Sequence, residues 1–149
     1  RAFTCKSFIF FITFIDITMF IISLAMTDSL NDDYFLGIDV KTLWELGGKD
    51  SRKLHNGQIF RWITPMVLHV GFLHIISNIV IQIIIGSLLE IIMKPVKFLA
   101  VYVLSGIGGV LMSALINDKL SAGASTAIFG ITGGLLAFVI GKITYKYYP

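Results

Sequence analysis

Four long apolar runs, separated by charged segments, dominate this sequence. They cover about residues 8–26, 65–93, 98–116 and 123–145. Each run comes close to or exceeds the ~20 apolar residues that an α-helix needs to cross a bilayer. The runs are continuously apolar rather than alternating, which is typical of membrane helices and not of barrel strands. The pattern therefore predicts an all-α, polytopic membrane helix bundle.

A polar stretch, about residues 27–61, separates the first two runs and holds most of the acidic residues. Large apolar side chains lie in it and just after it, among them Trp44 and Trp62. Because tryptophan prefers the boundary between lipid and water, we expect short amphipathic helices that lie in the membrane interface. A flexible, fully solvated loop is the alternative, which the two tryptophans disfavour.

Composition agrees with a membrane location. Hydrophobic residues make up 56% of the 149 residues and charged residues only 14%, too few for the surface of a soluble domain of this size. The net charge is +3, but the basic residues flank the apolar runs and form no basic-aromatic patch. Nucleic acid is therefore not an expected partner. The single cysteine, Cys5, cannot form an internal disulfide, and neither a metal site nor a cofactor is predicted.

Polar residues recur every four positions along the second apolar run. At 100° per residue this spacing places them on one slowly drifting face of a helix. A polar stripe facing lipid would be costly, so we expect it to face the interior of the bundle or water. The stripe consists of His74, Asn78, Gln82, Gly86 and Glu90, and His69 lies near its outer end.

The fourth run begins with Gly123-Ala124-Ser125-Thr126, which places Ser125 at a junction between loop and helix. The first N–H groups of a helix have no intrahelical partner and favour negative charge. A serine there can present its hydroxyl as a nucleophile while its own N–H binds an oxyanion. The alternative is a plain N-cap serine, and His74 and Asn78 could equally form hydrogen bonds to another helix.

Two further features of the runs bear on packing. Glycine and alanine recur after Ser125 and predict a small-residue face suited to close helix packing; these residues are Gly130, Gly133, Gly134, Ala137 and Gly141. Asp16 is the one charged residue of the first run. It is a candidate partner for another polar group inside the membrane, which the sequence does not identify.

Taken together, several short motifs resemble the rhomboid family of intramembrane serine proteases. The matching order and spacing extend from the first helix through the fourth. The combination of a histidine four residues before an asparagine on one span with Gly-Ala-Ser at the start of a later span is specific. The matching stretches are residues 60–65 (FRWITP), 68–78 (LHVGFLHIISN), 86–90 (GSLLE) and 123–130 (GASTAIFG).

The resemblance implies a mechanism and a role for each matching residue. Rhomboids cleave the transmembrane segments of other membrane proteins with a serine-histidine dyad and without a cofactor. The resemblance implies Ser125 as nucleophile and His74 and Asn78 as oxyanion-hole side chains. Supporting positions are Gly123, Arg61 of the loop after the first helix, the structural Glu90, Phe129 at the position of an aromatic that packs on the catalytic histidine, and His69.

The same resemblance implies where the protein lies. The expected partners are single-pass transmembrane substrates and the lipid bilayer. The family places its N-terminus in the cytosol and its serine toward the outer face of the membrane. Lysine and arginine divide evenly between the two sides in this arrangement, so the positive-inside rule does not decide orientation. The sequence does not indicate which membrane holds the protein.

Three positions depart from the family pattern. Phe60 replaces the tryptophan of a Trp-Arg pair, and Thr126 replaces the glycine after the nucleophile, where we expect it to crowd the site. The family's catalytic histidine lies in a sixth helix, and none of the histidines here matches it. We therefore expect residues 1–149 to be an inactive piece of a rhomboid-like domain, with four of at least six helices.

Two other functions remain open from the sequence. A non-catalytic rhomboid-like protein that binds transmembrane clients would share the fold and need no base, but it would not need Ser125, His74 and Asn78 together. A small channel or transporter could use the polar stripe of the second run as a path. That reading leaves the Gly-Ala-Ser junction without a role.

Overall fold

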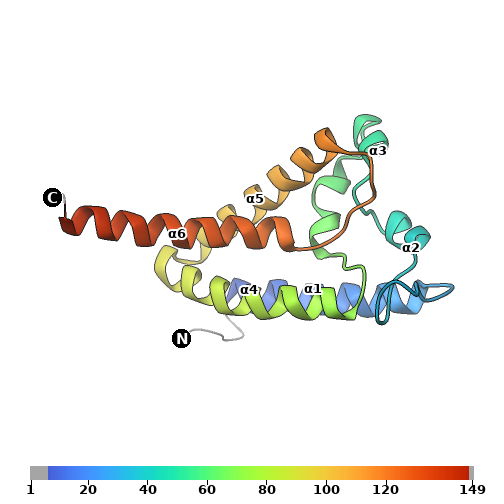
Figure 1. The fold of residues 1–149 in the computed structure, drawn as a ribbon, viewed down its shortest axis with the longest axis horizontal. Helices are drawn as coiled ribbons and strands as arrows, with labels where there is room; N and C mark the ends of the chain where they lie inside the picture. The colour runs from blue at the N-terminus through green and yellow to red at the C-terminus, as the bar shows by residue number, and fades with distance from the viewer. Residues whose placement is uncertain (1–6, 148–149) are drawn as a thin grey trace.

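The computed structural model describes residues 7–147, and four long helices form its framework (Figure 1). Each is long and apolar enough to cross a membrane, which confirms the predicted all-α bundle of membrane helices. The long helices are α1 (Phe8–Met26), α4 (Phe72–Met93), α5 (Pro95–Ile116) and α6 (Ser125–Tyr147).

The helix boundaries differ from the apolar runs in two places. The second run begins at residue 65, but helix α4 begins only at Phe72, after the short 3₁₀ helix η2 (Thr64–Val67) and an extended segment. Proline would fit the first turn of a helix, but Leu68 and Gly71 both have extended backbone, and Gly71 is the N-cap of α4, so the α-helix begins only after that glycine. Helix α5 starts at Pro95 rather than near residue 98, because proline fits the first position of a helix.

A buried cluster of hydrogen-bonded side chains joins three of the long helices. Gln82 of α4 donates to Asp16 Oδ2 (2.8 Å) and Thr13 Oγ1 (3.2 Å) of α1. The hydroxyl of Tyr102 on α5 donates to Gln82 Oε1 (2.7 Å). Gln82 is fully buried and Asp16 is 1% exposed. Gln82 is thus the membrane partner of Asp16 that the sequence left unidentified.

Glu90, near the C-terminal end of α4, binds the start of α1. Its two carboxylate oxygens accept hydrogen bonds from the backbone N–H groups of Phe8 (2.8 Å) and Ile9 (3.1 Å). These donors belong to the first turn of α1, where they lack intrahelical partners and favour a negative charge. One turn earlier, Gly86 lets Ile9 approach so closely that a Cβ there would collide with it. The part of the polar stripe from Gln82 to Glu90 therefore faces α1.

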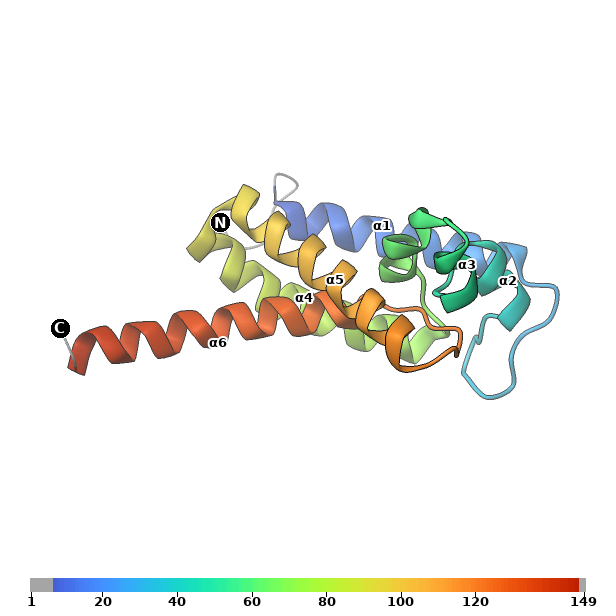
Figure 2. The same ribbon diagram turned by 90° about the horizontal axis from the view of Figure 1, so that it is seen from above.

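The segment between α1 and α4 folds into short helices, as the tryptophans indicated. Aspartates cap two of them: Asp39 accepts from the Thr42 N–H (2.9 Å) and Asp50 from the Lys53 N–H (3.1 Å). These short elements lie at the end of the molecule opposite the C-terminus, beside the loop that leads from α5 into α6 (Figures 1 and 2). They are α2 (Val40–Glu45), α3 (Ser51–His55), η1 (Ile59–Trp62) and η2.

Helix α6 packs on α5 and α4 through only part of its small-residue face. A Cβ at Gly130 would collide with Ser105 of α5, and one at Gly134 would come 3.2 Å from Leu89 of α4. By contrast, no described atom lies within 4 Å of such a Cβ at Gly133 or Gly141. The second half of α6 extends past the ends of α4 and α5 (Figures 1 and 2). Close packing therefore concentrates on the half of α6 that begins with Ser125.

Candidate active site

The side chains of His74 and Ser125 both lie close to the point where a Cβ of Gly123 would be. An ideal Cβ at Gly123 would be 2.7 Å from His74 Cε1, 3.0 Å from His74 Nε2 and 3.6 Å from Ser125 Oγ. Gly123 also has φ +145°, a backbone conformation that side chains rarely adopt. Only glycine combines this backbone with room for the imidazole. Gly123 thus brings the start of α6 against the N-terminal end of α4.

The side chains around Ser125 carry polar atoms that have no hydrogen-bond partner among the described residues. Seven buried side-chain nitrogen or oxygen atoms are unpaired, and five of them belong to residues in or next to this site. Buried polar atoms are normally paired, so each exception needs an explanation. For Asn78 Nδ2 and a His74 N–H, a donor held ready for an oxyanion is one such explanation. The five are His69 Nδ1 and Nε2, His74 Nδ1, Asn78 Nδ2 and Thr126 Oγ1.

Asn78 lies one turn after His74 on the same face of α4 and is buried. Its amide nitrogen can donate two hydrogen bonds, and neither is used within the described chain. Ser125 is the first residue of α6, so its backbone N–H has no partner within that helix. The part of the polar stripe in the N-terminal half of α4 therefore offers donors near a serine, whereas the part in its C-terminal half binds α1.

The ring of His69 lies next to the ring of His74. His69 lies in the extended segment before α4, is fully buried, and its ring is 5.4 Å from the His74 ring in an edge-on arrangement. Burial, with a smaller contribution from the charge of His74, lowers the pKa of His69 to about 3. His69 is therefore neutral at physiological pH, and its ring restricts where the His74 imidazole can lie.

The other predicted site residues lie farther from Ser125 or face elsewhere. Arg61 is buried and holds the segment between α1 and α4 together by donating to the backbone oxygens of Trp44 (2.9 Å) and Gly48 (2.6 Å). Glu90 binds the first turn of α1, as described. Phe129 follows Ser125 by one turn of α6 and is 77% exposed.

Thr126 does not face the space between Ser125 and His74. A Cβ at Gly109 of α5 would lie 2.5 Å from Thr126 Cβ, so the threonine side chain packs into the interface between α5 and α6. The prediction that Thr126 crowds the site is therefore wrong: its side chain packs closely against α5 instead. The larger side chain is accommodated because α5 has glycine opposite it.

Sequence reasoning missed the contacts that fix the loop before Ser125. The N–H of Gly123 donates to the backbone oxygen of Pro65 (2.7 Å), and Lys49 pairs with Ser121 in an isolated antiparallel bridge. Lys49 itself is fully buried. No periodicity or motif marked it, because a lysine in a polar segment is normally expected at the surface.

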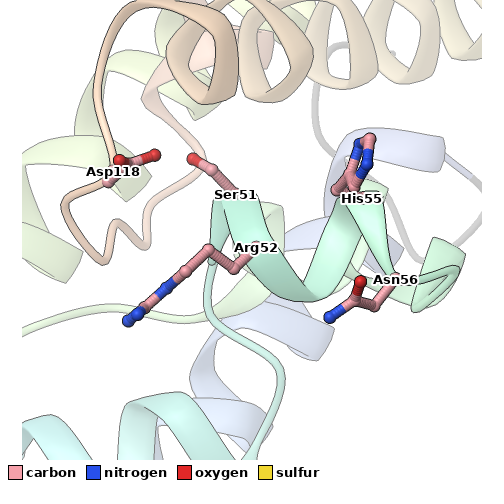
Figure 3. Close-up of a pocket in the computed structure, with 5 residues that line it drawn as sticks. All are labelled: Ser51, Arg52, His55, Asn56 and Asp118. Atoms are coloured by element: carbon pink, nitrogen blue, oxygen red, sulfur yellow. The ribbon is translucent and has the colours of Figure 1, made fainter.

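A separate surface hollow lies between α3 and the loop after α5 (Figure 3). Figure 3 shows that its polar side chains point in different directions and do not converge on one point. Nor do the described residues contain a group of three histidine, cysteine, aspartate or glutamate side chains that could hold a metal ion. The hollow is lined by Ser51, Arg52, His55, Asn56 and Asp118. It offers no arrangement that resembles a catalytic site.

Comparison with known proteins gives consistent matches. The chain is 39% identical over 132 residues to Rhomboid-like protease 3 of Toxoplasma gondii, covering 88% of this chain and 48% of that protein. It is 36% identical over 118 residues to RHOMBOID-like protein 5 of Arabidopsis thaliana, covering 77% of this chain and 38% of that protein. Rhomboid protease GluP of Bacillus subtilis is 36% identical over 98 residues, covering 66% of this chain and 19% of that protein.

The chain thus spans less than half the length of these three relatives. No solved structure gives a significant match. The rhomboid domain model matches residues 56–146, which include the whole of α4, α5 and the site at the start of α6. On this match and these relatives, the chain belongs to the rhomboid family and is an integral membrane protein.

Proposed function

We propose that the protein containing this chain is an intramembrane serine endopeptidase that cleaves transmembrane segments of other, single-pass membrane proteins. The observation that carries the proposal is that Ser125 begins α6 and that its hydroxyl and the His74 ring both lie next to Gly123. Two of the relatives are named as proteases, which supports the same reaction class.

In this reaction the Ser125 hydroxyl attacks the carbonyl carbon of a peptide bond. Its proton passes to a histidine base, for which we propose a residue outside these 149 positions. The base then protonates the leaving amine as the C–N bond breaks, and water hydrolyses the acyl-enzyme by the reverse proton transfers. The Ser125 N–H, His74 and Asn78 donate to the oxyanion of each tetrahedral intermediate.

The three histidines of this chain are less suited to act as the base. His55 lines the surface hollow on α3, and the lowered pKa of His69 makes its buried ring a poor proton acceptor. His74 is close enough to Ser125 to be considered, but its position beside Asn78 suits an oxyanion donor. If His74 were the base, its removal would abolish turnover as completely as removal of Ser125, which makes the two roles distinguishable.

The test uses the full-length protein in liposomes with a transmembrane reporter substrate. We expect Ser125→Ala to abolish both cleavage and labelling by a fluorophosphonate probe. Ser121→Ala is the matched control, because Ser121 contacts Lys49 through its backbone rather than its side chain. Undiminished cleavage by the Ser125→Ala variant would refute the proposal. A wild-type protein that binds the reporter without cutting it would instead support a non-catalytic client-binding function.

We further propose that the N-terminus is cytosolic and that Ser125 lies toward the outer face. The short helices between α1 and α4 lie beside the loop that leads into α6, so both would be on that face (Figure 1). Labelling of an introduced cysteine at exposed Lys119 by an impermeant reagent tests this orientation in intact cells or sealed vesicles. Labelling only after permeabilisation would show the opposite orientation, with residue 119 on the inner side of the membrane.

A further inference from the structure

Lys49 is a fully buried lysine in the segment between α2 and α3. Its ammonium group donates to the backbone oxygen of Asn117 (2.8 Å), to Asn117 Oδ1 (3.1 Å) and to the backbone oxygen of Ser113 (3.4 Å). An ammonium group has three protons to donate, so these three acceptors satisfy it. Such a complete set of contacts is what a buried cation requires, because an unpaired one would be strongly destabilising.

The acceptors of Lys49 lie at the C-terminal end of α5. Ser113 belongs to the last turn of that helix, and Asn117 is its C-cap. The last carbonyl groups of a helix lack intrahelical donors and carry a partial negative charge, which a cation stabilises. The Lys49 side chain therefore fixes the point at which the chain leaves α5 and begins the loop that leads to Ser125.

The backbone of Lys49 fixes the same loop a second time. Its N–H donates to the Ser121 oxygen (2.8 Å) and its oxygen accepts from the Ser121 N–H (3.3 Å). Closer to the nucleophile, the Gly123 N–H donates to Pro65 (2.7 Å). The loop between α5 and Ser125 is therefore held at its start, its middle and its end, and Lys49 provides two of these three attachments.

Lys49 is in turn connected to Arg61, which is buried in the segment between α1 and α4. Arg61 donates to the oxygen of Gly48, the residue before Lys49, at 2.6 Å. An ideal Cβ at Gly48 would lie 3.0 Å from the Leu120 side chain, so the two segments also pack closely. A continuous set of contacts thus leads from Arg61 through Lys49 to the loop that precedes Ser125.

We propose that Lys49 is a positioning residue for the nucleophile: it anchors the loop before Ser125 so that the serine stays aligned with His74 and the oxyanion donors. The catalytic part of this inference rests on the proposed function. The anchoring part does not, because the contacts of Lys49 can be tested without turnover. A misplacement of about 1 Å at a reacting group can cost on the order of 100-fold in rate.

The first experiment measures amide hydrogen exchange in the full-length protein, with Lys49→Met compared with wild type. We expect exchange of the segment 117–123 to become at least about tenfold faster, since opening there no longer breaks the Lys49 contacts, while α4 is unchanged. Lys119→Met is the matched control: it removes the same charge from the same loop, but Lys119 is exposed. Unchanged exchange in segment 117–123 of Lys49→Met would overturn the proposal.

The second experiment separates kcat from KM with the reporter substrate. Lys49→Met should lower kcat by about 10- to 100-fold with little change in KM, and Lys49→Arg should recover part of the loss, because it keeps the charge and the donors. Asn117→Ala should add little to the Lys49→Met loss, since both act through one contact. Full kcat in folded Lys49→Met would overturn the positioning role.

The two experiments distinguish the two proposals. An inactive wild-type protein whose segment 117–123 loosens in Lys49→Met would contradict the protease function and still support anchoring by Lys49. If Lys49→Met does not fold, the Lys49→Gln variant provides the same tests, because it removes the charge and shortens the side chain that reaches the Asn117 and Ser113 oxygens. Unchanged exchange and unchanged kcat in that variant would overturn the proposal.

Discussion

His74 Nε2 and Ser125 Oγ lie within 3.0 Å and 3.6 Å, respectively, of the point where a Cβ of residue 123 would be. The two side chains come from helices that are separated by α5 in the sequence, and Gly123 is the residue between them. This arrangement makes the site sensitive to a single methyl group.

Gly123→Ala should lower the rate of fluorophosphonate labelling at Ser125 by about 100-fold or more, because the added methyl group displaces His74 and strains the backbone. Labelling kinetics in the full-length protein measure the effect. Gly57→Ala is a suitable control, since Gly57 also has positive φ (+86°) but no atom lies within 4 Å of its Cβ position. It should affect stability modestly and labelling hardly at all. Equal labelling of wild type and Gly123→Ala would contradict the geometry described here.

Asn78→Ala should lower kcat by about 100- to 1,000-fold, the usual effect of removing one oxyanion donor. KM should change little, because the lost hydrogen bond forms mainly in the transition state. Ser77→Ala serves as control on the same helix: Ser77 is exposed, and its hydroxyl donates to the His74 oxygen within α4. An Asn78→Ala variant with wild-type kcat would remove Asn78 from the proposed mechanism.

His74→Ala should reduce kcat by a similar factor but leave detectable turnover, since the base and the other donors remain. Residual cleavage is best measured against Ser125→Ala in the same preparation, which gives the background. Loss of cleavage down to that background would instead assign His74 as the base, and the proposed histidine outside these residues would be unnecessary.

The sequence predicted the helices well because long apolar runs have one favourable structure in lipid. It placed the start of the second helix too early, since the backbone is extended at Leu68 and Gly71, within an otherwise apolar run. Periodicity put Gln82 on the polar face, but its pairing with Asp16 depends on how α1 packs against α4. Lys49 was missed for a similar reason, because its acceptors at Asn117 are distant in sequence. The roles of Ser125, His74 and Asn78 remain predictions.

Gln82→Leu should lower the free energy of unfolding by about 1–3 kcal/mol, because it leaves Asp16 and Tyr102 buried without their shared partner. Unfolding in mixed detergent micelles, followed by circular dichroism, gives the value. The double variant Gln82→Leu with Asp16→Leu should regain part of the loss, since no unpaired carboxyl group then remains. Additive losses in the double variant would show that the two residues do not act through a common contact.

Acid should destabilise the protein through His69, which lies in the extended segment before α4. Its pKa is lowered to about 3 by burial, whereas an unfolded histidine titrates near 6.5. Between these values the unfolded state binds more protons than the folded state, so stability is full above pH 6.5 and falls progressively toward pH 3. His69→Gln, which cannot titrate, should flatten this part of the stability profile. Unfolding measurements from pH 4 to 7.5 test the prediction, and a wild-type profile as flat as that of His69→Gln would contradict a buried, neutral His69.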